Sequence, residues 1–263
     1  MRIALLAWAL LCSPARAARI GDDGRPMPPG YRPRPQTVPD HVLKDGGASA
    51  RLPPGVPLLL VVHPQQHFDA RASAAGGARR AAAAFNAKGW PVVYLRLCPY
   101  PTPYEPPDLD HYMTEPALEV CSEDGEHRLS VDTDRIVLAG GFDSRCLTTA
   151  ALAAVDRAVA AQKRRAPNSP AVVTLELVAD GVYTDGRRAD SEPHPAAPWT
   201  LSRLSRSRLE ESLRFMVSPT NPRFASYLAD LTAGGRRPPR VESERGVVLR
   251  DGDPGVVIRL LAR

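Results

Sequence analysis

The sequence has few lysines and few aromatic residues. Lys44, Lys88 and Lys163 are its only lysines, so arginine carries nearly all of the positive charge behind the formal net charge of +5. Aromatic residues make up 6% of the chain, and the arginines are scattered along it rather than gathered into one block. A nucleic-acid-binding surface needs a basic stripe with aromatic residues between the charges. The composition therefore argues against a nucleic-acid partner.

Long apolar runs are also scarce. One lies near the N-terminus, where a charged start and an apolar stretch over 3–11 are followed by Ala15-Arg16-Ala17, a small-x-small cleavage pattern. This is the pattern of a secretory signal peptide. No later run approaches the ~18 residues that cross a membrane. We expect residues 1–17 to be removed and the mature protein to be exported, periplasmic or secreted, with no membrane span.

Cysteine is the third scarce residue, because the chain has only 4. Removal of the signal peptide leaves Cys98, Cys121 and Cys146. In an oxidising compartment an odd number suggests one disulfide and one free thiol. Cys98 and Cys121 bracket a loop-like segment, and closing it would contribute on the order of 3 kcal/mol. We predict that these two cysteines pair and that Cys146 stays free.

What the sequence does contain is a series of short apolar runs. They lie at 58–62, 91–96, 136–139 and 171–178, with helix-forming stretches at 72–88 and 147–163 between them. Runs that are apolar throughout are typical of parallel strands covered on both faces. A strand, a helix and a strand in that order predict a right-handed parallel crossover. We expect an α/β fold of three layers, with a parallel sheet and helices on both faces.

Composition divides the chain into segments. They are the signal peptide (1–17), an arm rich in Pro, Gly and Arg (18–56), an α/β domain (57–232) and a C-terminal hairpin extension (233–263). Within the domain, the long connection over 98–133 is rich in proline, and a connection of that length is more often functional than filler. Helical spacing predicts helices over 201–217 and 223–231. In the extension, 247–249 and 256–258 flank a glycine turn and predict the hairpin.

The stretch 135–152 predicts a strand, a sharp turn and a helix. Gly140 and Gly141 break the strand, and Asp143 and Ser144 are good helix N-caps, so Cys146 falls in the first helical turn. There the unpaired backbone N–H groups and the helix dipole favour a thiolate. We predict a nucleophile with a depressed pKa at Cys146. The alternative is that Cys146 is a small buried apolar residue of an ordinary αβ unit.

The first strand delivers polar residues at its C-terminal end, the edge at which open α/β sheets bind ligands. His63 is the first of them, and a histidine facing Cys146 could act as its base. The alternative is a structural histidine bonded to the proline-rich loop. Candidate substrate-binding residues are Gln65, His67, His111 and Tyr112. For His67 and His111 the alternative is a partly exposed polar residue with no role in the site.

Over about residues 57–183 these pieces resemble the isochorismatase-like cysteine hydrolase family. The matching pieces are the strand running into His63–Phe68, Gly89 to Arg96, Gly140 to Cys146 with Thr149-Ala150 behind, and Leu177 to Asp180. The resemblance implies a Rossmann-like sheet, Cys146 as the nucleophile, and an oxyanion turn formed by Gly140, Gly141, Phe142 and Asp143. In the family that turn often contains a cis peptide.

The chain also departs from the family. His63 stands where the family has its catalytic aspartate, and no lysine lies between Lys88 and Cys146 to match the family lysine. Arg128 is a candidate for the missing cation. Leu97-Cys98-Pro99 replaces the Asp-x-His metal ligands of nicotinamidases, so we expect no metal.

Two other site classes are excluded by the same turn. Gly140-Gly141 lacks the third glycine of a dinucleotide loop, and Ser144 lacks the flanking glycines of a serine-hydrolase elbow, so we expect no cofactor. Two functions remain. One is an exported hydrolase of a small amide or related substrate that uses Cys146 with His63 as an altered base. The other is a non-catalytic descendant of the fold that binds a small molecule or a protein partner.

Overall fold

The computed structural model describes residues 52–65, 68–69, 72–97, 111–121, 129–184, 202–203 and 208–262. The four apolar runs form β1 (Leu58–Val62), β2 (Val92–Arg96), β4 (Arg135–Gly140) and β5 (Ala171–Thr184). Every residue of β1 and β2 is buried, as strands covered on both faces require. β1 pairs in parallel with β2 and β4, and β4 pairs in parallel with β5, so the predicted parallel sheet is confirmed.

The sheet continues on both sides of these strands. Its order is β3-β2-β1-β4-β5-β9-β7-β8, and β6 (Ser202–Arg203) pairs with β5 off this path. The outer strands are β3 (Leu118–Cys121), β7 (Pro239–Ser243), β8 (Gly246–Leu249) and β9 (Asp253–Leu261). Because β1 lies between β2 and β4, the segments that follow β1 and β4 leave the sheet side by side at its C-terminal edge.

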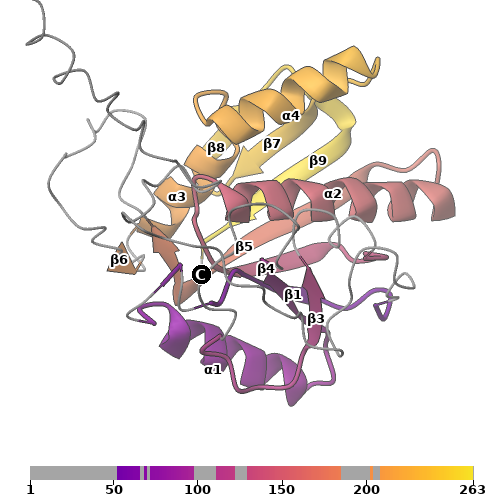
Figure 1. The fold of residues 1–263 in the computed structure, drawn as a ribbon. Coiled ribbons are helices and arrows are strands. Elements are labelled where there is room, and N and C mark those ends of the chain that lie inside the picture. The colour runs from indigo at the N-terminus through magenta and orange to yellow at the C-terminus, as the bar shows by residue number, and fades with distance from the viewer. Residues whose placement is uncertain are drawn as a thin grey trace, which may run out of the picture.

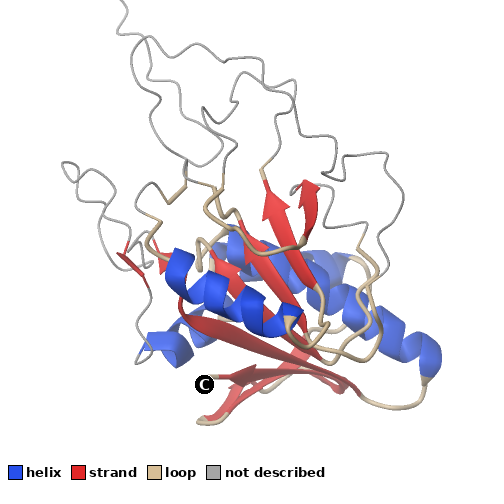
Figure 2. Cartoon of the chain, turned by 90° about the horizontal axis from the view of Figure 1, so that it is seen from below, coloured by secondary structure: helices blue, strands red, loops and turns tan. Residues whose placement is uncertain are grey.

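Helices cover the two faces of the sheet, which confirms the three-layer fold. α1 (Ala75–Asn86) lies on one face, and α2 (Cys146–Arg165) and α3 (Leu209–Met216) lie on the other, with α4 (Pro222–Ala233) packed on α2 (Figure 1). Figure 2 shows α1 in front of the strands and the other helices behind them. Leu58, Leu60 and Val62 of β1 belong to the core under α2, whereas Leu59 and Val61 belong to the core under α1.

Two of the predicted elements are corrected, and one strand was missed. β8 pairs antiparallel with β7 and not with β9, so the expected hairpin of 247–249 with 256–258 is wrong. β9 instead lies between β5 and β7, parallel to both, where it buries Val257, Ile258 and Leu260. The helix expected over 201–217 begins only at Leu209. β3 was missed because it is four residues long and lies inside the proline-rich connection.

Candidate active site

The turn between β4 and α2 requires glycine at its first position. Gly140 has φ +86°, and a Cβ there would lie 2.0 Å from the carbonyl oxygen of Val62 on β1. The next residue, Gly141, donates its N–H to that same oxygen at 3.1 Å and is joined to Phe142 by a cis peptide bond. The N–H of Leu147 then donates to the carbonyl of Phe142 at 3.0 Å. The turn therefore passes tightly along the end of β1 and starts α2 at Cys146, as predicted.

The residues expected to cap α2 have a different role. The N-cap is Arg145 and it makes no side-chain cap hydrogen bond, so the prediction of Asp143 or Ser144 as cap is wrong. Asp143 is buried, and its Oδ2 accepts a 2.7 Å hydrogen bond from Ser212 of α3. Its carbonyl accepts a 2.6 Å bond from the hydroxyl of Thr148. A partner distant in sequence thus holds the carboxylate that was expected to bind the backbone of α2.

Cys146 is a free, partly exposed cysteine in the first turn of α2. Burial raises the pKa of its thiol, and this outweighs the positive charges of Arg223 and Arg145 and hydrogen bonds from the backbone of Phe142 and Cys146, which lower it. The expectation of a depressed pKa is therefore wrong, because desolvation of the thiolate raises the pKa by more than the charges and hydrogen bonds at the helix end lower it. At neutral pH the sulfur carries a proton, so a nucleophilic role needs a base.

His63 lies directly after β1, beside the nucleophile turn. Its backbone has φ +47°, an unusual value for a non-glycine residue and a kind of strain often found at functional sites. Its carbonyl accepts a 2.8 Å hydrogen bond from the hydroxyl of Tyr183. The imidazole is buried and stacks on Phe68, with ring centroids 4.7 Å apart. Phe68 and Tyr183 share a small cluster with Phe142 of the turn. The pairing of the His63 ring with Cys146 stays a prediction.

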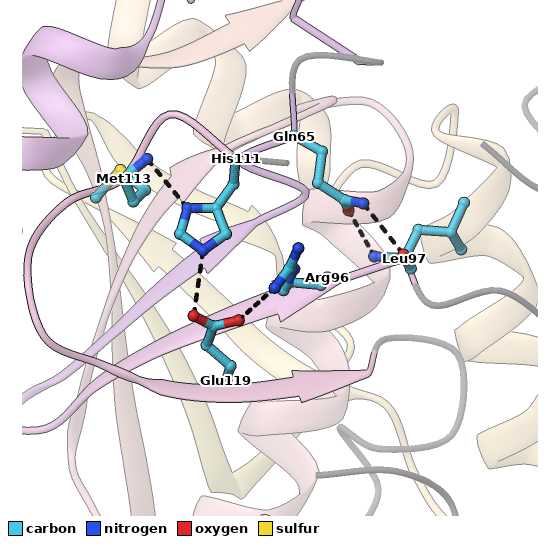
Figure 3. A network of polar contacts seen from close by, with 6 residues as sticks. All are labelled: Gln65, Arg96, Leu97, His111, Met113 and Glu119. Atoms are coloured by element: carbon cyan, nitrogen blue, oxygen red, sulfur yellow. Dashed lines mark hydrogen bonds and ion pairs between the residues drawn. The ribbon is translucent and has the colours of Figure 1, made fainter. Parts of the chain in front are cut away.

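A second group of residues, joined by polar contacts, lies on β2, on β3 and in the segment before β3, and we call it the Arg96 cluster: Arg96, His111, Met113 and Glu119 (Figure 3). Arg96 donates to Glu119 at 2.6 Å, and His111 Nε2 lies 3.2 Å from the other carboxylate oxygen. The N–H of Met113 donates to His111 Nδ1, so Nε2 carries the proton of the neutral ring. Burial raises the pKa of Glu119, but the hydrogen bonds from Arg96 and His111 outweigh it and lower the pKa overall.

Gln65 and Tyr112, two of the candidate substrate-binding residues, are buried next to this cluster. The amide of Gln65 bonds both backbone groups of Leu97, at 2.7 and 3.1 Å (Figure 3). Gln65 also forms a backbone bridge with His111. Burial raises the pKa of Tyr112, so its phenol stays neutral. A substrate-binding role for these residues stays a prediction, and His67 and Arg128 lie outside the described residues.

Sequence reasoning missed Arg223, which the fold brings to the cysteine. Asn221 is the N-cap of α4, and its Oδ1 accepts a 2.9 Å hydrogen bond from the N–H of Arg223. The side-chain amide of Asn221 also donates to Thr148, in the first turn of α2, at 3.4 Å. The available signal was the Asn221-Pro222 pair, which is typical of a helix start. Nothing local indicated that this start would lie against Cys146.

Other predictions about this region have mixed outcomes. Cys121 is disulfide-bonded, but Cys98 lies outside the described residues, so the pairing of the two stays a prediction. Within the described ranges, no three His, Cys, Asp or Glu side chains gather in a way that could hold a metal ion. In the same part of the chain, no helix is both long and apolar enough to span a membrane.

The fold and the site together define a three-layer α/β protein with a cysteine at a strand–turn–helix junction. No family model matches the sequence, and no curated protein does. Among solved structures, the chain is similar to a protein described as an isochorismatase hydrolase from Oleispira antarctica, at 13% identity and a TM-score of 0.32 over 68% of this chain and 90% of that one.

Two further similarities are of the same kind. A protein described as an isochorismatase from Burkholderia xenovorans LB400 has 13% identity and a TM-score of 0.35 over 70% of this chain and 90% of that one. The MAR1 ribonuclease from Caenorhabditis elegans has 14% identity and a TM-score of 0.33 over 68% of this chain and 91% of that one. These similarities concern the fold, and at such scores the function has to be argued from this chain's own residues.

Proposed function

We propose that the protein is an exported cysteine hydrolase of a small amide or related substrate, with Cys146 as nucleophile and His63 as base. The observation that carries the proposal is the position of Cys146. It is the one free cysteine among the described residues, and backbone groups of the turn and of its own residue bond its sulfur. Such N–H donors can also stabilise the negative charge that develops during acyl transfer.

The raised pKa of the Cys146 thiol sets the first step. Burial keeps the sulfur protonated, so the reaction must begin with removal of the proton. His63 follows β1, and Val62 of β1 is paired in register with Gly140 of the nucleophile turn. In the proposal, the imidazole takes the thiol proton as the sulfur attacks the carbonyl carbon.

The remaining steps return every group to its starting state. The tetrahedral intermediate collapses, the C–N bond breaks, and the imidazolium gives its proton to the leaving amine. This leaves a thioester on Cys146. A water molecule, deprotonated by His63, attacks the thioester, and the carboxylic acid leaves as the thiol is restored.

The test is hydrolysis of a panel of small amides by the mature protein, followed as release of ammonia or amine. We expect Cys146→Ala to lower the rate by at least about 10³-fold, because the nucleophile is lost. We expect His63→Gln to lower it by about 10²–10⁴-fold, because only the base is lost. Trapping the thioester on Cys146 by mass spectrometry would identify the nucleophile directly.

His111→Gln serves as a matched control for the histidine substitution. The side chain of His111 is 14% exposed, and it bonds Glu119 in the Arg96 cluster rather than lying next to the turn. A substrate-binding role of His111 would raise KM, so its variant should keep at least about half of the wild-type kcat if it folds. Equal losses in the two histidine variants, or unchanged hydrolysis in Cys146→Ala, would contradict the proposed roles.

The second candidate function is the non-catalytic one, and the raised pKa of the Cys146 thiol is the observation that favours it. A partly buried, protonated cysteine can pack as a small apolar residue. If no amide in the panel is hydrolysed and no thioester is trapped, this function replaces the first. Export is tested separately, by the N-terminal sequence of the protein secreted by cells that express the full chain, which we expect to begin after residue 17.

A further inference from the structure

We infer that the cysteine site selects a substrate that carries a negative charge, such as a carboxylate, and that Arg223 is the residue that selects it. This inference deepens the proposed function, on which it rests for the identity of the reacting centre. It starts from a juxtaposition that the fold creates: the N-terminal ends of α2 and α4 lie together, and each brings an arginine to the cysteine.

The hydrogen bonds at the helix ends carry the geometry. Asn221 bonds Thr148 of α2 with one side-chain atom and the N–H of Arg223 with the other. Tyr227, one turn further along α4, donates a 2.7 Å bond to Asp156 of α2. Two separate contacts therefore hold α4 against α2 and keep Arg223 beside the first turn that contains Cys146.

Two charges act on the sulfur of Cys146, and both are positive. Arg223 has the larger effect and Arg145 the smaller. Within the described part of the chain, no carboxylate acts on the thiol with comparable strength. The nearby acidic residue is Asp143, whose carboxylate bonds Ser212 on the side of α3. The guanidinium of Arg223 pairs with no carboxylate of the described residues, and Arg223 is exposed.

These observations favour an anionic ligand rather than a neutral one. The helix ends add partial positive charge in the same direction as the arginines. A guanidinium that pairs with no carboxylate of the described residues retains its donors for a substrate carboxylate, which it binds in a bidentate manner. A neutral amide carries no charge in its ground state for this field to attract. We therefore expect the preferred substrates to be small amides that also carry a carboxylate.

The test compares two reagents that alkylate the same sulfur: iodoacetate, which is anionic, and iodoacetamide, which is neutral and of similar size. Both react with the thiolate, so the ratio of their rates does not depend on the pKa of Cys146 or on catalysis. Rates are measured near pH 9 on the mature protein, by mass spectrometry of the peptide that contains Cys146. The reference is 2-mercaptoethanol, a neutral thiol.

We expect the iodoacetate-to-iodoacetamide ratio to be about two- to fivefold higher for Cys146 than for the reference, as a single charge a few ångströms away implies. Arg223→Gln should remove most of that excess, and Arg223→Lys should retain it. The matched control is Arg164→Gln, an exposed arginine at the opposite end of α2. High salt should lower the ratio in the wild type.

Each outcome decides the inference. An unchanged ratio in Arg223→Gln, an equal fall in Arg164→Gln, or no alkylation of Cys146 by either reagent would overturn it. A ratio that falls only in Arg223→Gln supports it. If the ratio falls in this way while no amide is hydrolysed, the anion preference stands and the hydrolase proposal fails. If an amide is hydrolysed but the alkylation ratio shows no charge preference, the hydrolase proposal stands and the anion preference fails.

Discussion

Two polar clusters among the described residues differ in how their charges are paired: the Arg96 cluster on and beside β2 and β3, and the cysteine site at the N-terminal ends of α2 and α4. In the Arg96 cluster, the guanidinium, the carboxylate and the imidazole bond one another and are largely buried. At the cysteine site, the two arginines act on a thiol, and Arg223 is exposed without a carboxylate partner among the described residues. The first arrangement suits stability and the second suits the binding of an anion.

Backbone conformation separates the two regions in the same way. Gly140 and His63, which flank the nucleophile turn, have positive φ values of +86° and +47°. The residues of the Arg96 cluster lie on β2, on β3 and in a segment bridged to Gln65, and none of them has a positive φ. Strain of this kind is maintained only where the surrounding structure enforces it. The comparison predicts that substitutions in the two regions fail for different reasons.

The largest expected effect is at the nucleophile turn. Gly140→Ala would add a Cβ 2.0 Å from the Val62 carbonyl in a backbone conformation unfavourable for alanine. We expect it to lower the free energy of unfolding by about 4 kcal/mol, from overpacking and strain together. The control is Gly235→Ala, where φ is +68° but nothing lies within 4 Å of the added Cβ. Gly235→Ala should lower the free energy of unfolding by about 1 kcal/mol. Urea unfolding measures both variants. Similar losses would show that the turn is not tightly held.

The next largest effect is in the Arg96 cluster. Glu119→Gln removes the charge that pairs with buried Arg96, and we expect a loss of about 3 kcal/mol at pH 7. The pKa of Glu119 is lower in the folded protein than in the unfolded chain. Its stabilisation is therefore present above the unfolded value of about 4.3 and is lost as the pH falls through the lowered folded value.

Urea unfolding of the wild type and Glu119→Gln between pH 3 and 7 measures this difference, which should shrink at the acidic end. The control is Glu242→Gln, which breaks an exposed pair with Arg240 whose side chains are 40% and 33% exposed. That pair should contribute less than about 1 kcal/mol at any pH. A pH-independent difference between Glu119→Gln and the wild type would show that packing, rather than charge, is responsible.

The smallest effect concerns the reactivity of Cys146. Because burial raises the pKa of its thiol, iodoacetamide should react at pH 7 at least about threefold more slowly than with a free thiol, and the rate should still rise at pH 9. If His63 is the base, the wild type should react faster than His63→Ala near neutral pH. A rate that levels off below pH 8 would mean that the arginines and N–H groups outweigh burial after all.

Much of the fold followed from local sequence. The apolar runs predicted β1, β2, β4 and the start of β5, because a strand buried on both faces has to be apolar throughout. The glycine pair predicted the turn, because Gly140 alone can adopt that φ so close to β1. Cys146 was placed correctly at the start of α2 for the same reason: each of these features depends on a few consecutive residues.

The tertiary structure decided what depends on residues distant in sequence. The position of β9 between β5 and β7, the burial that raises the pKa of Cys146, and the approach of Arg223 each join segments that no local pattern connects. Asp143 shows the reason most directly. Its local sequence predicted a helix cap, but Ser212 of α3 competes for the same carboxylate oxygens. The hydrogen-bond partners of a side chain near a strand–turn–helix junction depend on its neighbours in space. The sequence by itself determined only the junction.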